Sequence, residues 1–124
     1  MQEFEFDVRF YENRNGQEPI KEFLEELEKN GETKRADKIY AYIRVLCLYG
    51  TRVGYPYVKH IEGDIWELRP FDDRIFFFYF KDRNFILLHH FLKKTKKTPK
   101  REIEQAERNM KDHLERSGGD GKQL

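Results

Sequence analysis

The chain begins with a regular alternation of apolar and charged residues and then changes to helical spacing. Between Phe4 and Phe10 every second residue is apolar, which predicts a half-buried β-strand. Pro19 suits a first helical position, and the apolar residues after it recur every three or four positions until an Asn-Gly pair ends the pattern. Thr33 is placed to cap a second amphipathic helix, which ends at Gly50. Because only a short loop joins them, the two helices should form a hairpin.

The spacing changes to that of strands after residue 54. Four segments separated by short turn sequences predict strands: Tyr57–Glu62, Ile65–Pro70, Arg74–Phe80 and Phe85–Leu92. The gaps are too short for crossover helices, so these strands should form an antiparallel meander. The third segment is apolar on both faces, which indicates a central strand covered on each side. Thr98 and Pro99 then start a final helix with an apolar stripe.

This order of elements predicts a single α+β domain over residues 1–116. The first strand is expected to pair beside the late strands and complete one sheet, with both helices of the hairpin packed on one face. The domain would then have two layers, and the second sheet face would be open or only partly covered, where a ligand could lie. Residues 117–124, which include three glycines, predict a flexible C-terminal tail.

Charge is distributed unevenly along the 124 residues. The net charge is only +1, but residues 33–101 hold 16 basic and 7 acidic side chains, whereas residues 1–32 hold 4 and 10. A basic central segment indicates a polyanionic partner, with ordinary solvated surface as the alternative. The N-terminus lacks a signal-peptide profile and no apolar stretch is long enough to cross a bilayer. A cytoplasmic protein with no membrane partner is therefore expected.

Several common kinds of site do not fit the sequence. It contains no Gly-rich phosphate loop, nucleophile elbow or dinucleotide fingerprint. Cys47 is the only cysteine and lies in an apolar run, which favours a small buried hydrophobe over a nucleophile. His89 and His90 are adjacent on a strand, so they should point to opposite faces and cannot chelate one metal ion without distortion. Asp72 and Asp73 fit a turn. The sequence therefore predicts neither a metal site nor a cofactor.

Basic side chains gather instead at the ends of the predicted strands. Alternation should direct Trp66 toward the helices, and Glu67 and Arg69 toward the open sheet face. Arg74 opens the next and most apolar strand, so a hairpin between these strands would bring it close to Arg69. Two neighbouring guanidinium groups repel each other unless a carboxylate or a phosphate lies between them. Separate ion pairs with Glu67 or with the aspartates of the turn are the alternative.

A second basic cluster follows the last predicted strand. Six Lys or Arg fall within residues 93–101, a density that suits salt-sensitive contacts with phosphates. A solvated loop would explain this cluster taken alone. Together with Arg69 and Arg74 the cluster favours binding of a polyanion.

These residues resemble the RelE/ParE toxin superfamily, and most closely its HigB-like, phage-derived branch. The resemblance follows the element order over nearly the whole chain, and its most specific part is a Leu-His-x-Phe-x-Lys-Lys-Thr-x-Lys-Thr-Pro stretch from Leu88 to Pro99. Its other carriers are the Ile-Trp-Glu-Leu-Arg run of residues 65–69, Arg74 at the start of an aromatic strand, and Glu102 and Ala106 in the closing helix.

The resemblance implies a curved antiparallel sheet with a helical hairpin on one side, a C-terminal helix and a basic concave active site. It implies a toxin that cleaves messenger RNA, often on the ribosome, and that is neutralised by an antitoxin, commonly a helix-turn-helix DNA-binding protein. Carried over residue by residue, the basic positions of the motif are Arg69, Arg74, Lys93 and Lys94.

RNA can be cleaved by its own 2′-hydroxyl, so the protein need only position the strand, stabilise charge and move protons. The candidate catalytic residues are Arg69, Arg74, Lys93, Lys94 and His89, and the candidate RNA-binding residues are His60, His90, Lys96 and Lys97. The three histidines are possible acids or bases near neutral pH, and strand phase decides which of His89 and His90 faces the open side. A non-enzymatic inhibitor of the same fold that acts on a protein such as DNA gyrase, or a phage-derived binding protein without catalysis, are the alternatives.

Overall fold

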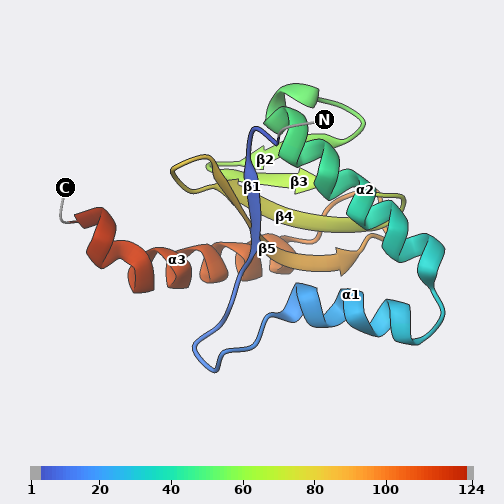
Figure 1. Cartoon of the computed structure of the whole chain (residues 1–124), viewed down its shortest axis with the longest axis horizontal. Coiled ribbons are helices and arrows are strands. Elements are labelled where there is room, and N and C mark those ends of the chain that lie inside the picture. The colour runs from blue at the N-terminus through green and yellow to red at the C-terminus, as the bar shows by residue number, and fades with distance from the viewer. Residues whose placement is uncertain (1–3, 123–124) are drawn as a thin grey trace.

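The computed structural model describes the backbone of residues 4–122 and the side chains of residues 4–117. In this part of the chain, α-helices and strands follow the order β1 (Asp7–Phe10), α1 (Pro19–Lys29), α2 (Thr33–Tyr49), β2 (Val58–Glu62), β3 (Ile65–Leu68), β4 (Asp73–Tyr79), β5 (Asn84–Leu92) and α3 (Lys100–Lys122) (Figure 1). A short 3-10 helix, Gly50–Val53, follows α2. The predicted α+β order is thus confirmed.

The strands form one five-stranded sheet in the order β1-β5-β4-β3-β2, as described for residues 4–122. β2 to β5 are antiparallel neighbours, as the meander predicted. β1 does join the late strands, but it pairs with β5 in the parallel direction. The sheet is therefore mixed rather than antiparallel throughout. The helical hairpin returns the chain so that β2 runs opposite to β1, and alternation over four strands then makes β5 parallel to β1.

The first strand is shorter than its alternating sequence predicts. Pairing with β5 begins only at Asp7, because the backbone N–H groups of Glu5 and Phe6 donate to the carbonyl of Cys47 in α2. The Phe6 ring also lies against Gly50, which has a φ of +65° and where a Cβ atom would come within 2.7 Å of the ring. Only glycine accepts both the backbone conformation and this close approach. The alternating residues therefore lie in two environments: Glu5 and Phe6 contact the end of α2, and Asp7–Phe10 form a strand of the sheet.

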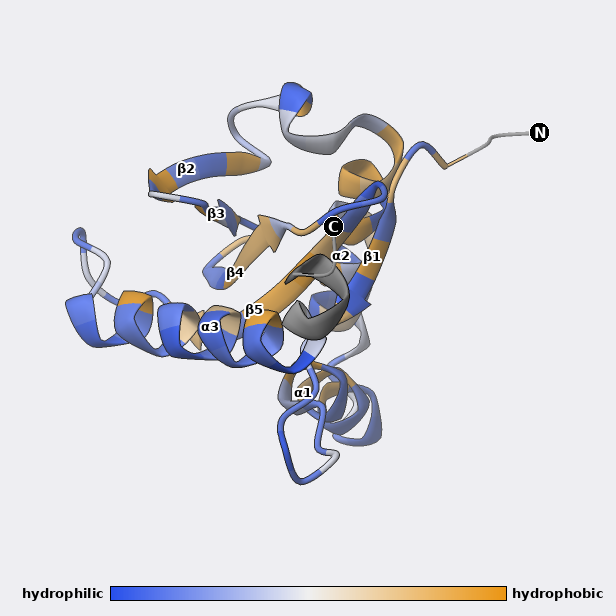
Figure 2. Cartoon of the chain, turned by 90° about the vertical axis from the view of Figure 1, so that its left-hand side faces the viewer, coloured by the Kyte–Doolittle hydropathy of each residue, from blue (hydrophilic) through white to orange (hydrophobic). Residues whose placement is uncertain are grey.

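Two apolar clusters lie on opposite faces of the sheet. The ribbon of the strands β4 and β5, which contribute to both clusters, is largely hydrophobic (Figure 2). The cluster under α1 and α2 is built around Leu24, Ile39, Leu46, Ile75 and Phe77. The other is built under α3 around Phe76, Phe78, Leu88, Phe91 and Ala106. The central strand β4 is buried on both sides, as predicted. Each fully buried aromatic or aliphatic side chain contributes about 1.5–3 kcal/mol.

The helix α3 covers part of the second sheet face, which the sequence predicted to be open or only partly covered. Because α3 packs on β4 and β5, that part of the molecule has three layers, and the less covered part of this face lies toward β2 and β3. α3 is held by Asp112, which accepts hydrogen bonds from the hydroxyl of Tyr11 at 2.6 Å and from Arg14 at 2.8 Å. The helix runs on to Lys122, into the segment for which the sequence predicted a tail.

The N-cap of α2 is not the residue that the sequence predicted. Thr33 is the first residue of α2 and does not cap it, since the N-cap is Glu32, whose side chain makes no capping hydrogen bond.

Cys47 is half-buried in α2, and burial raises the pKa of its thiol. In the described part of the chain, none of the helices combines the length and apolar character needed to span a membrane.

Candidate functional site

A buried glutamate lies at the centre of the basic region that the sequence predicted. β3 alternates as expected, with Trp66 and Leu68 on the side of the helical hairpin and Glu67 on the opposite face. Glu67 is 1% exposed and lies opposite Phe76 of β4. A carboxylate is costly to bury unless cations or hydrogen-bond donors surround it. Its neighbours therefore decide what this part of the sheet can do.

The antiparallel pairing of β3 and β4 brings the two predicted arginines together around this carboxylate. Oε1 of Glu67 lies 3.9 Å from Nη1 of Arg69 and 3.8 Å from Nε of Arg74. Nη1 of Arg74 also donates to the carbonyl of Phe71 at 2.6 Å and to that of Asp73 at 2.9 Å. The carboxylate between the guanidinium groups is thus Glu67, and the side chains of the β3–β4 turn do not supply it.

Two lysines complete the positive surroundings of Glu67. Burial raises the pKa of Glu67, and Arg74, Arg69, Lys93 and Lys59 lower it, in that order of size. Lys59 is the direct partner of Glu67 in the β2–β3 register, and Lys93 follows β5, where its N–H donates to the carbonyl of Asp72. Four cations around one carboxylate leave a net positive field, which suits an anionic ligand. Lys59 was not singled out from the sequence; the short turn between the predicted strands was the signal that could have found it.

His89 is the histidine that shares the sheet face of Glu67 and Arg74. Its Nε2 donates to Oε1 of Glu102 in the first turn of α3 at 2.7 Å, and its ring stacks on Phe91, which pairs with Arg74 across the strands. A histidine oriented by a carboxylate is a usual arrangement for proton transfer. His89 also borders a cavity of about 490 Å³ between α1 and α3, so solvent can reach the His89 side chain.

His90 points to the other face, as the alternation predicted, and belongs to a different network. Its Nε2 donates to Oδ1 of Asp73 at 2.7 Å, and its ring stacks on Phe23 at 3.8 Å. Arg35 of α2 binds the same carboxylate with Nε at 2.8 Å and Nη2 at 2.6 Å. Burial alone would raise the pKa of Asp73, but the hydrogen bonds from Arg35 and His90 outweigh it and lower the pKa to about 2. The structure therefore does not bring His90 to the arginine pair.

Asp73 differs from the role that the sequence predicted for it. It was expected to form a turn with Asp72, but it is the first residue of β4 and its side chain is 2% exposed. Its partners come from α2 and β5, which are distant in sequence. The Asp73 network ties the helical hairpin to the sheet.

His60 and the remaining lysines also have defined places. Nε2 of His60 lies 2.7 Å from the carbonyl of Gly63, and its ring meets Trp66 edge-on, on the sheet face opposite Glu67. The sequence analysis grouped His60 with the other candidate RNA-binding residues. The β2–β3 register instead places His60 on the sheet face opposite Glu67 and the arginine pair. Lys94, Lys96 and Lys97 are exposed in the segment between β5 and α3 and form no ion pair with a described residue.

No three His, Cys, Asp or Glu side chains gather as metal ligands among the residues whose placement is described.

No curated protein matches the chain. A family model of phage-derived, Gp49-like proteins (DUF891) matches residues 22–111, which run from the first turn of α1 into α3 and include Glu67, the arginine pair and the lysine segment. Because this match covers well over half of the 124 residues, the chain belongs to the Gp49-like family of phage-derived proteins.

Proposed function

We propose that this chain is the toxin of a type II toxin–antitoxin system, of the HigB-like branch of the RelE/ParE superfamily, and that it cleaves messenger RNA. The observation that carries the proposal is the convergence of Arg69 and Arg74 on the buried carboxylate of Glu67, with Lys59 and Lys93 beside them. Paired guanidinium groups in a positive field suit a phosphate. The exposed lysines of residues 94–97 extend this surface along the path of an RNA backbone.

The reaction needs no metal ion, because the RNA supplies its own nucleophile. His89, oriented by Glu102, takes the proton of a 2′-hydroxyl, and the oxygen attacks the adjacent phosphorus. The bond from phosphorus to the 5′-oxygen breaks, and Lys93 delivers a proton to the departing oxygen. Arg69 and Arg74 stabilise the negative charge that develops on the phosphoryl oxygens. The products are a 2′,3′-cyclic phosphate and a 5′-hydroxyl.

The proposed partners follow from the same toxin assignment. The substrate is messenger RNA in the ribosome, where unpaired bases and exposed phosphates are presented to a small protein with a basic surface. A cognate antitoxin, a helix-turn-helix DNA-binding protein, neutralises the toxin in the cytoplasm. Growth arrest then results from loss of translatable message.

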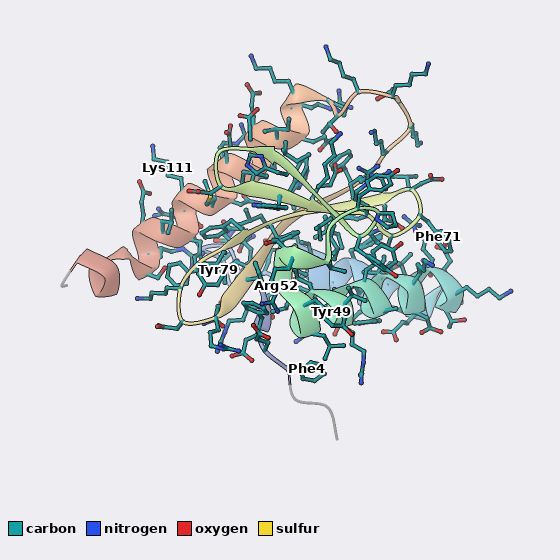
Figure 3. The ribbon with its side chains drawn as sticks, turned by 90° about the horizontal axis from the view of Figure 1, so that it is seen from above. Phe4, Tyr49, Arg52, Phe71, Tyr79 and Lys111 are labelled. Atoms are coloured by element: carbon teal, nitrogen blue, oxygen red, sulfur yellow. The ribbon has the colours of Figure 1, made fainter. Side chains whose placement is uncertain are left out.

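The direct test is expression of the chain alone, followed by mapping of new 5′ ends in ribosome-bound message. The key variant replaces Arg69, Arg74 and Glu67 together with glutamine, because removing only the arginines would leave Glu67 buried and uncompensated. We expect new cleavage sites with the wild type and with Arg52→Ala, an exposed control arginine labelled in Figure 3, and none with the triple variant.

Growth arrest that persists in the triple variant, with no new cleavage sites in any sample, would contradict the nuclease proposal. That result would instead favour an inhibitor of the same fold that acts on a protein such as DNA gyrase.

A further inference from the structure

A cleft of about 330 Å³ opens beside the two arginines at the β3–β4 turn. Its lining includes Lys38 and Tyr42 of α2, Tyr55 of the loop before β2, Phe71 of the turn, and Arg69 and Arg74. Small-molecule sites in proteins begin at about this volume. Phe71 marks this end of the molecule in Figure 3, whereas Tyr79 and Lys111 lie toward the other end.

Two aromatic rings of the cleft are unusually exposed. Tyr55 is 77% exposed and Phe71 is 64% exposed. Rings left in water at one place on a surface favour a ligand that can stack on them. Unpaired nucleobases are recognised in this way, and the stacking tolerates any base because each has a π-face.

A cationic side chain lies over each of the two rings and gives the cleft positive charge. The guanidinium carbon of Arg69 lies 5.1 Å from the centre of the Tyr55 ring, and Nζ of Lys38 lies 4.6 Å from the centre of the Phe71 ring. None of the described residues that line the cleft is acidic. The cleft therefore combines stacking platforms with positive charge, the combination that binds single-stranded nucleic acid.

The backbone of Phe71 connects the cleft to the arginine pair. Phe71 has a φ of +56°, a conformation that a bulky residue rarely adopts. Its carbonyl accepts the 2.6 Å hydrogen bond from Arg74. Residues held in such rarely populated conformations are enriched at ligand-binding and active sites. The same arginine thus contacts Glu67 and fixes the turn that presents the ring.

We propose that this cleft binds one unpaired base of the RNA, stacked on Tyr55 and Phe71, next to the phosphate that Arg69 and Arg74 hold. This inference rests on the proposed function. It makes Tyr55 and Phe71 binding residues that set the position of the strand, with Lys38 placing the Phe71 ring. Loss of either ring should weaken RNA binding more than it slows the bond-breaking step.

The test uses single-stranded RNA oligonucleotides that cannot be cleaved, because every ribose carries a 2′-O-methyl group. One base at a time is replaced by 2-aminopurine, whose fluorescence falls when it stacks. With the wild-type chain we expect strong quenching at one position of the oligonucleotide. Tyr55→Ala and Phe71→Ala should abolish that quenching and weaken binding by about tenfold each, whereas Tyr55→Phe and Phe71→Tyr should retain both.

Tyr49→Ala is the matched control, because Tyr49 is another exposed aromatic residue, 50% exposed, but lies at the end of α2, outside the cleft lining. Circular dichroism establishes that each variant is folded. Binding without quenching at any position, or equal affinity of the wild type and both alanine variants, would overturn the base-binding site. Quenched binding to an RNA whose unmodified counterpart is never cleaved, either free or as message on translating ribosomes, would leave the site standing and refute the nuclease function.

Discussion

Oε1 of Glu67 lies 3.8 Å from Nε of Arg74 beneath the surface of the sheet, and both groups retain unused hydrogen-bonding capacity. Among the described residues, neither Oε2 of Glu67 nor Nε of Arg74 has a hydrogen-bond partner. Burial raises the pKa of this carboxyl even though four cations oppose the rise. Glu67 therefore costs stability as an anion, and its position between two arginines points to a role in arranging them.

Replacing Glu67 with glutamine should separate stability from activity. Glutamine keeps the shape of the side chain but removes the charge that lies between the guanidinium groups, so their orientation toward a phosphate is lost. We expect RNA cleavage to fall about tenfold or more, since each such preorganised charge contributes a few kcal/mol to transition-state binding. Because the folded protein favours the uncharged form of this carboxyl, stability measured by urea unfolding near neutral pH should stay equal or rise. Glu25→Gln on the exposed face of α1 is the control.

The same substitution carries a pH signature. The folded-state pKa of Glu67 lies above the ordinary value of 4.5, so the wild type loses stability as the pH rises from 4.5 through that folded-state pKa. The stability advantage of Glu67→Gln should therefore grow over this range and then level off. An advantage that shrinks with rising pH would show that the folded protein favours the carboxylate.

Asp73 should show the opposite dependence. Although burial opposes ionisation, Arg35 and His90 lower its pKa from 3.8 to about 2. The stability that this group contributes is present above its unfolded-state pKa and is lost as the pH falls from about 4 to about 2, by about 2 kcal/mol. Urea unfolding over this range measures the loss. In Asp73→Asn this component of the stability loss should disappear. If the stability of the variant falls with decreasing pH as steeply as that of the wild type, the Arg35–Asp73–His90 network is contradicted.

The two faces of β5 should give different histidine phenotypes. His89→Gln removes the proposed proton acceptor, so single-turnover cleavage should fall by about a hundredfold or more with the fold intact. His90→Gln should lower stability, because it removes a donor to buried Asp73, yet leave the cleavage rate of the folded fraction unchanged. His60→Gln should change neither quantity. If His89→Gln cleaves at the wild-type rate, the proton acceptor is another group.

The lysines between β5 and α3 should act through the phosphate backbone. Lys96→Ala and Lys97→Ala are each expected to weaken binding of single-stranded RNA regardless of its sequence. Each should reduce the slope of log affinity against log salt by roughly 0.7. Lys111→Ala, on the outer part of α3, should leave the slope unchanged. Titrations by fluorescence anisotropy at several salt concentrations measure this slope, and equal slopes in all variants would place the RNA elsewhere.

Hydrophobic periodicity predicted the elements whose local pattern agrees with their tertiary surroundings. α1 begins at Pro19 as expected, and β4 is covered on both faces because its apolar side chains from Ile75 to Phe78 alternate between the two apolar clusters. Periodicity could not predict the parallel pairing of β1 with β5, which depends on the path of the whole chain. The coverage of the second face by α3 is likewise a long-range result.

The candidate site was predictable only where short turns fixed the register. Arg69 and Arg74 meet Glu67 because one tight hairpin joins their strands. His60 was misplaced because the register of β2 and β3 puts it opposite Trp66, and a sequence does not reveal that phase. The burial of Asp73 depends on Arg35, which lies 38 residues earlier in the chain. The cleft at Phe71 also combines α2 with two loops.

The most direct test of RNA cleavage by the 2′-hydroxyl is the chemistry of the product ends. Translating ribosomes are programmed with a synthetic message, and a second message carries one 2′-deoxy nucleotide immediately 5′ of the mapped cleavage position. The account predicts 2′,3′-cyclic phosphate and 5′-hydroxyl ends from the first message and no cleavage at that position in the second. Cleavage of the 2′-deoxy message, or products with 3′-hydroxyl and 5′-phosphate ends, would contradict it.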